Sequence, residues 1–136
     1  MIAFLDANVL IYLIEGAEPF AGGVRNTLQA ITHNHENTQL AMSALSRLEC
    51  RVGSMKSENS LVLDAYDEFF SRPGLTLVPL SGDVLDLATA IRARHGIKTP
   101  DALQAACCLQ LGSDHLFITG DRGFRRIPGL HVRALG

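Results

Sequence analysis

The sequence has no tryptophan, and aromatic residues make up only 6% of it. An extended platform of aromatic side chains on which bases stack is therefore not expected. The sequence also lacks an excess of basic residues. It has 12 Lys and Arg and 14 Asp and Glu, which gives a net charge of −2. The average charge therefore does not point to nucleic acid as a partner.

A disulfide framework is absent as well. The three cysteines, Cys50, Cys107 and Cys108, are odd in number, and no CxxC pair occurs. Such residues are typical of reduced thiols in the core of a cytosolic protein.

Long apolar runs are also lacking, since no stretch approaches the roughly 18 residues of a membrane helix. The segment "MIAFLDANVLIYLIEG" is apolar, but it has no basic region, and Asp6 and Asn8 interrupt it. We therefore expect a soluble, cytoplasmic protein with no targeting segment and no membrane partner.

Short apolar runs alternate with amphipathic segments along the 136 residues, a length that predicts a single domain over residues 1–136. The predicted strands cover residues 2–5, 38–43, 75–80, 115–119 and 130–135. The predicted helices cover residues 8–16, 19–34, 44–56, 60–72, 82–96 and 99–112, with Leu61, Ala65 and Phe69 on one apolar face of the fourth. This alternation predicts an α/β fold of three layers, a parallel sheet of about five short strands flanked by helices.

Several helix ends carry local signals. Ser43, Ser81 and Thr99 stand where N-cap residues are expected, and a proline follows Thr99. Gly16 and Gly96 stand where helices end, as the left-handed C-cap conformation favours.

Four carboxylates follow predicted strands or begin the helices after them. Asp6 comes directly after the first strand, and Asp121 follows the fourth after one glycine. Glu49 lies in the first two turns of the helix 44–56, and Asp101 lies in the first turn of the helix 99–112. Because the carboxyl ends of parallel strands form the binding edge of such a sheet, we expect the four acids to converge there.

Each acid also has a structural interpretation. Asp6 could cap a helix, and Ser46 with Glu49 matches the capping-box spacing, although we expect the helix to start at Ser43. Asp101 could favour the helix dipole, and Asp121 could serve a turn. The four together are harder to explain in this way, because all fall at one end of the predicted sheet.

Clustered carboxylates repel one another unless a cation or protons intervene. Oxygen ligands alone suit a hard cation, Mg²⁺ or Mn²⁺, rather than Zn²⁺, and no cysteine or histidine has a zinc-binding spacing. We therefore predict a Mg²⁺ or Mn²⁺ site.

The charge outside this acidic group has the opposite sign. Without the four acids, 14 − 4 = 10 acidic residues remain against 12 basic ones, which leaves +2. An acidic metal pocket with a basic rim suits a phosphodiester substrate. The candidate residues for binding the phosphates of such a substrate lie near the acids in sequence: Arg47, Arg51, Lys98, Arg122, Arg125 and Arg126.

The segments that carry the acids, "FLDANVLIY", "SALSRLEC", "KTPDALQAA" and "FITGDRGF", resemble the four acidic motifs of PIN-domain ribonucleases. The short forms are most similar to the VapC toxins of toxin–antitoxin systems. The resemblance covers nearly the whole chain in the right order. It implies that Asp6, Glu49, Asp101 and Asp121 are the metal-site acids, with Asn8 and Thr119 at the supporting polar positions.

The resemblance also implies an activity and partners. The expected fold is the PIN-like parallel sheet, and the expected activity is Mg²⁺- or Mn²⁺-dependent endonucleolytic cleavage of RNA. The expected partners are a cognate antitoxin protein and a second copy of the chain in a homodimer.

Two other functions are considered. A catalytically silent PIN-like module that binds RNA or protein would be expected to lack one or more acids, and this chain has all four. A phosphohydrolase with an aspartyl nucleophile would place Asp6 after its first strand. Enzymes of the haloacid-dehalogenase type have a second aspartate two residues later, where this chain has Asn8.

The segment "FITGDRGF" carries its own expectations. We expect Thr119 to orient a carboxylate or a water through its hydroxyl, and Phe124 to pack inward. We also expect Gly120 to adopt a backbone conformation that a residue with a β-carbon would resist.

Overall fold

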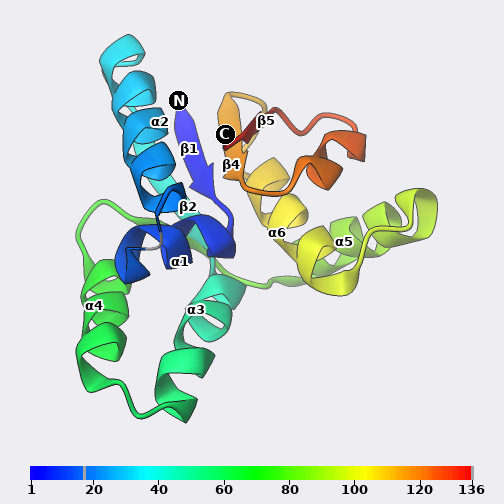
Figure 1. The fold of residues 1–136 in the computed structure, drawn as a ribbon. Helices are drawn as coiled ribbons and strands as arrows, with labels where there is room; N and C mark the ends of the chain where they lie inside the picture. Colours follow the sequence, from blue (N-terminus) through cyan, green and yellow to red (C-terminus); the bar gives the residue numbers. More distant parts are fainter. Residues whose placement is uncertain (17, 136) are drawn as a thin grey trace.

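A computed structural model describes residues 1–16 and 18–135 of the chain (Figure 1). The strands are β1 (Ile2–Leu5), β2 (Gln39–Ser43), β3 (Thr76–Val78), β4 (His115–Thr119) and β5 (Val132–Ala134). The helices are α1 (Ala7–Glu15), α2 (Phe20–Asn34), α3 (Ala44–Lys56), α4 (Ser60–Ser71), α5 (Gly82–His95) and α6 (Thr99–Gln110), followed by the 3-10 helix η1 (Arg122–Arg126).

The five strands form one parallel sheet in the order β3-β2-β1-β4-β5. The first strand of the chain is therefore the central one, between β2 and β4. The predicted α/β class and the parallel sheet of five short strands are confirmed. Because every strand runs the same way, the segments that leave the carboxyl ends of β1, β2 and β4 begin at one edge of the sheet.

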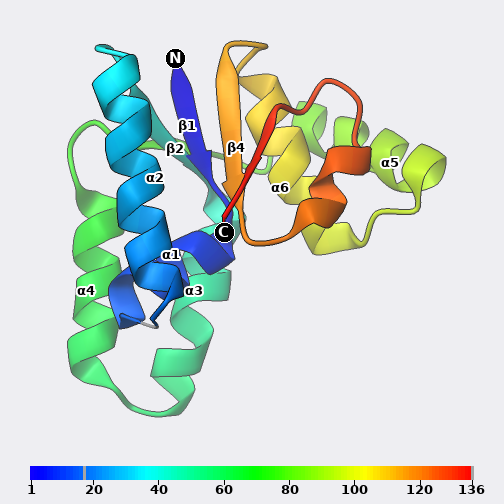
Figure 2. The same ribbon diagram turned by 45° about the horizontal axis from the view of Figure 1, so that its top comes forward.

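Helices cover both faces of this sheet. Figure 2 shows α1 to α4 on one side and α5 and α6 on the other. Along β1, Ala3 and Leu5 belong to the apolar cluster under α1 to α4, whereas Phe4 belongs to the cluster under α5 and α6. This alternation is the period of two of a β-strand, here with both faces buried.

The predicted caps are mostly confirmed. The hydroxyls of Ser43 and Ser81 accept hydrogen bonds from the first turns of α3 and α5, and Gly16 and Gly96 end α1 and α5 in the left-handed conformation. The prediction for Thr99 is wrong, because α6 begins one residue earlier. Its N-cap residue is Lys98, whose carbonyl accepts the Ala102 N–H at 2.8 Å.

The predicted apolar face of α4 is also wrong in one place. Leu61 is 82% exposed, whereas Tyr66 is fully buried in the apolar cluster on the side of α4 that faces α1 and α3. The Tyr66 hydroxyl donates to the carboxylate of Glu15 in α1 at 2.6 Å, so this bond and the ring fix the rotation of α4. The three cysteines are buried free thiols, as expected.

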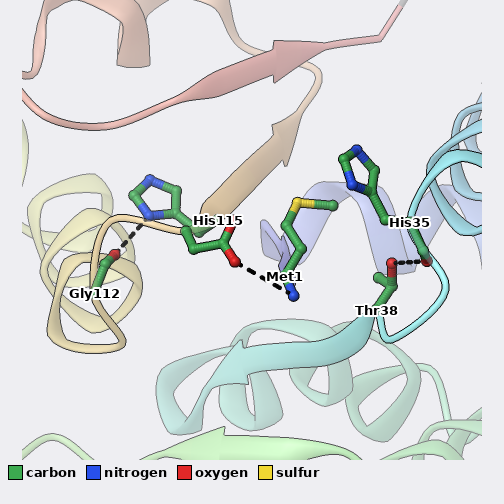
Figure 3. A network of polar contacts seen from close by, with 6 residues as sticks. Met1, His35, Thr38, Gly112 and His115 are labelled. Atoms are coloured by element: carbon green, nitrogen blue, oxygen red, sulfur yellow. Dashed lines mark hydrogen bonds and ion pairs between the residues drawn. The ribbon is translucent and has the colours of Figure 1, made fainter.

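Polar contacts also tie together the opposite edge of the sheet, where the strands begin (Figure 3). The amino group of Met1 lies 3.6 Å from the carboxylate of Asp114, and Nδ1 of His115 lies 2.8 Å from the Gly112 carbonyl. Nε2 of His115 accepts the N–H of His131 at 3.1 Å, so Nδ1 carries the hydrogen and donates it to Gly112. These contacts hold β4 and the start of β5 in place at the end of the sheet away from the predicted acids.

Across residues 1–16 and 18–135, no helix is long and apolar enough to cross a membrane.

Candidate active site

Asp6 is buried where β1 ends and α1 begins, with 6% of the residue exposed. Its Oδ1 accepts the Ala7 N–H at 2.9 Å, and its Oδ2 accepts the hydroxyl of Thr119 at 2.7 Å. Burial, opposed by these two bonds and assisted by the charges of Asp101 and Glu49, raises the pKa of Asp6 to about 6. Asp6 is therefore both the cap of α1 and one member of an acidic group.

Thr119 links two of the predicted acids, as expected of its hydroxyl. It is fully buried at the end of β4, donates to Asp6, and accepts the backbone N–H of Asp121 at 3.0 Å. Asn8 contributes a weaker contact, because its Oδ1 accepts the Gly120 N–H at a long 3.5 Å.

Asp121 caps η1, and its Oδ1 accepts the Gly123 N–H at 2.8 Å. The turn role considered for this residue is therefore real. Its carboxylate also lies near enough to Asp101 to raise the pKa of that group. Phe124, three residues on, is buried and packs on the Phe117 ring at 4.6 Å between centroids, as predicted.

The prediction for Gly120 is wrong. Its backbone is outside the left-handed region, so its conformation is open to other residues. A β-carbon at this position would meet the Tyr12 ring at 3.4 Å, which is ordinary van der Waals contact. Neither backbone freedom nor close approach therefore requires a glycine at this position, and an alanine would fit.

Glu49 projects from α3 toward α6. The capping-box interpretation fails, because α3 begins at Ala44 and Ser46 is a buried residue inside the helix. Nε2 of Gln104 in α6 donates to the Ser46 hydroxyl at 2.8 Å and to Oε1 of Glu49 at 2.9 Å. The pKa of Glu49 is raised by burial and then by Asp101, and lowered by the bond from Gln104.

Sequence reasoning missed Gln104. A glutamine in a helix is usually exposed, so nothing in its residue type marks it. The available signal is its spacing. Gln104 follows Asp101 by three residues, which puts both side chains on the same side of α6.

Asp101 lies in the first turn of α6, half-buried. Burial and the charge of Asp121 raise its pKa, and Lys98 lowers it. The four predicted acids are therefore joined by mutual repulsion, from Asp6 to Glu49 and Asp101, and from Asp101 to Asp121.

The donor set fits a hard cation. It consists of carboxylate oxygens, and buried Asp6 is held by neutral donors rather than by a cationic side chain. Repulsion among these groups is what a bound cation would relieve. Among the described residues, no three acidic, histidine or cysteine side chains already stand close enough to surround an ion, so ligation requires the acids to move toward one another.

Asp101 and Asp121 line a polar cleft of about 220 Å³. Lys98 and Arg126 line the same cleft beside Ile97. Two of the predicted RNA-binding residues are thus next to two of the acids, and opposite charges meet in one concave space.

The other basic residues are distributed differently. Arg122 and Arg125 are exposed on η1, close in sequence to Asp121. Nε of Arg51 lies 2.9 Å from Oδ1 of Asp67, an ion pair between α3 and α4 that lacks the alignment of a hydrogen bond. Arg47 lines a different depression, about 490 Å³ in volume, along α3.

Similar folds occur in solved toxin–antitoxin structures. VapBC2 from Rickettsia felis, bound to a DNA fragment from its promoter, matches with a TM-score of 0.78 and 20% identity over 100% of both chains. VapBC-1 from nontypeable Haemophilus influenzae matches with a TM-score of 0.74 and 20% identity over 98% of both chains. A toxin-antitoxin complex from Klebsiella pneumoniae matches with a TM-score of 0.65 and 26% identity, over 97% of this chain and 96% of that one.

No significant match was found among the curated proteins. The PIN domain family matches residues 3–130, a span that holds the sheet up to β4, all six helices and the four acids. This chain belongs to the PIN-domain family.

Proposed function

We propose that this chain is a Mg²⁺- or Mn²⁺-dependent endoribonuclease and the toxin of a VapBC-type toxin–antitoxin pair. The observation that carries the proposal is the coupled acidic group at the carboxyl edge of the sheet, in which the buried Asp6 is held by Thr119. A buried carboxylate without a cationic partner is costly, and it is well explained as a ligand awaiting a cation.

Asp6, Glu49, Asp101 and Asp121 would hold the ion. A bound ion would supply two effects there: it would lower the pKa of a water so that its hydroxide attacks phosphorus, and it would stabilise the charge on the phosphate oxygens. Thr119 keeps Asp6 and the backbone of Asp121 in fixed relative positions. The other carboxylates would then move toward Asp6 to surround the ion.

Lys98 and Arg126 would bind the phosphates of the RNA strand, because they line the cleft that holds Asp101 and Asp121. Arg122 and Arg125 extend this basic surface along η1. Arg51 is a weaker candidate, since Asp67 already engages it. Arg47 faces the α3 depression and is better placed to meet a protein partner.

An antitoxin is the proposed protein partner. Leu48, Val52 and Met55 of α3 are 63%, 49% and 56% exposed, and they line the depression that also holds Arg47. An exposed apolar strip of this kind suits the apolar face of a partner segment. Toxin–antitoxin complexes are also what the similar solved structures contain.

A homodimer and a cytoplasmic location complete the proposal. The buried free thiols suit a reducing compartment. Sedimentation of the purified chain tests the dimer directly.

The activity is tested with labelled RNA and DNA strands of the same sequence, each incubated with Mg²⁺, with Mn²⁺ or with EDTA. We expect cleavage of RNA within the strand, dependent on the ion, and little cleavage of DNA. Asp6→Asn and Asp101→Asn should each lower the rate at least a hundredfold. Asp86→Asn, an exposed acid on α5, is the control and should cleave like the wild type.

Equal cleavage in EDTA would contradict the metal site. Binding of RNA without cleavage by the wild type under any of these ions would instead support a catalytically silent module.

A further inference from the structure

Gln104 is a buried polar residue that connects two helices of the site. It is 1% exposed in the middle of α6, and both hydrogens of its Nε2 are used on α3. One goes to the Ser46 hydroxyl at 2.8 Å and the other to Oε1 of Glu49 at 2.9 Å. Because Asp101 lies one turn earlier on α6, this helix supplies one acid and also holds another.

The amide oxygen of Gln104, unlike its nitrogen, makes no hydrogen bond within the described residues, although it is buried. A buried acceptor without a donor costs free energy, and a Leu or Met of similar size would avoid that cost. If the amide group were rotated by half a turn, its oxygen would face the Glu49 carboxylate and be repelled by it. The contacts therefore establish that the NH₂ group, and not the oxygen, faces α3. Stability of the core therefore does not explain a glutamine at this position.

The hydrogen bond to Glu49 explains why a glutamine occupies position 104. Glu49 is half-buried and has three rotatable side-chain bonds, so without a partner its carboxylate would sample many orientations. The N–H of Gln104 fixes Oε1 and leaves Oε2 available to face the other acids. Groups that orient a ligand in this way commonly change metal affinity by about 10- to 100-fold.

We propose that Gln104 is a positioning residue, which orients Glu49 for metal binding and does not itself contact the ion. This inference rests on the proposed function, because it requires Glu49 to be a metal ligand. It goes further in naming a residue outside the four acidic motifs on which the affinity for the ion depends.

Mn²⁺ affinity, measured by the loss of the free-ion electron paramagnetic resonance signal, tests the inference without any RNA. Gln104→Met should weaken Mn²⁺ binding about tenfold or more. Without metal, its melting temperature should stay the same or rise. RNA cleavage by this variant should recover at saturating Mn²⁺. Ser46→Ala is the matched control, because it removes the other partner of Nε2 but keeps the bond to Glu49, and its Mn²⁺ affinity should stay within about twofold of wild type.

A combined variant separates positioning from packing. If Gln104 acts through Glu49, Gln104→Met should add no further loss of Mn²⁺ affinity in a Glu49→Gln background. Gln104→Leu serves as a second replacement, and circular dichroism checks that each variant folds.

Three results would overturn the inference. Wild-type Mn²⁺ affinity in a folded Gln104→Met or Gln104→Leu variant would show that the amide does not position a ligand. Failure of both replacements to fold would show that the core needs the amide. Absence of Mn²⁺ binding by the wild-type chain would instead remove the proposed metal site itself.

Discussion

Asp6 shows how one residue serves the fold and the proposed site together. Its Oδ1 caps α1, its Oδ2 receives the Thr119 hydroxyl, and its burial raises the pKa to about 6. The two hydrogen bonds favour the charged form, but the loss of hydration outweighs them. The folded chain without metal therefore holds this carboxylate at a cost near neutral pH, and the proposed cation would offset that cost.

The raised pKa of Asp6 predicts how the free energy of unfolding depends on pH. The folded pKa of about 6 exceeds the reference value of 3.8, so between these values the folded chain binds more protons than the unfolded chain. In EDTA, the free energy of unfolding contributed by Asp6 should therefore rise as the pH falls from 7.5 to about 4.5. The change is on the order of 3 kcal/mol at most.

Urea denaturation in EDTA at pH 7.5 and 5 measures this effect. Asp6→Asn should be more stable than the wild type at pH 7.5, and the difference should shrink at pH 5. An equal difference at both pH values would mean that Asp6 is not the titrating group. Added Mg²⁺ should stabilise the wild type more at pH 7.5 than at pH 5, because protons compete with the ion.

At the scale of the elements, η1 is a short basic segment with two anchors. Asp121 caps its start, and the Phe124 ring is fixed against Phe117 in the core. The arginines between and after these anchors are exposed, so their charges are held near the cleft without being buried.

Arg125→Ala should therefore weaken RNA binding and leave cleavage intact at high RNA concentration. Because one phosphate contact is lost, the slope of log K against log salt should become shallower by about one. Fluorescence anisotropy with labelled RNA in EDTA, repeated over a range of salt concentrations, measures both effects. Arg94→Ala, on the exposed side of α5, is the control. If RNA affinity fell equally in both variants, the effect would come from the net charge of the chain rather than from η1.

The elements of this chain show which features a sequence specifies. Alternating apolar strands and capped helices predict the parallel sheet, and the acids follow because they stand at strand ends. The rotation of α4 could not be predicted, since its two apolar stripes fit a helix equally well. Leu61 of the predicted stripe is exposed, whereas Ala65 and Phe69 are half-buried, and contact between Tyr66 and Glu15, far apart in sequence, sets the rotation.

The same limit applies to the site. The bond between Gln104 and Glu49 joins residues on two different helices, and no local pattern reports it. The start of α6 is a smaller case, because Thr99 and Lys98 both precede a proline and either could begin the helix.

At the scale of the whole molecule, the proposed antitoxin surface and one of the four acids, Glu49, share α3 but point in different directions. Glu49 faces α6, whereas Leu48 and Val52 line the exposed apolar depression. A partner seated on that depression would therefore contact the same helix that carries a proposed metal ligand.

Val52→Asp should accordingly release the chain from an antitoxin encoded by a neighbouring reading frame. We expect at least a tenfold weaker complex by calorimetry, because a charge would be buried in an apolar contact. RNA cleavage by the free chain should not change. Leu61→Asp is the control, since Leu61 is more exposed but does not line the depression. If both substitutions weakened the complex equally, the partner would bind outside the depression or along both α3 and α4.

The central position of β1 has a consequence for how the chain is made. The first strand is completed on one side by β2 and on the other by β4, and Asp6 receives its hydroxyl bond from Thr119. During synthesis on the ribosome, β1 must therefore wait for β4 before both of its edges are paired, and Thr119 comes 113 residues after Asp6. A partly made chain that stops before β4 lacks both Thr119 and Asp121, so nuclease activity as proposed here could arise only after β4 and η1 have left the ribosome.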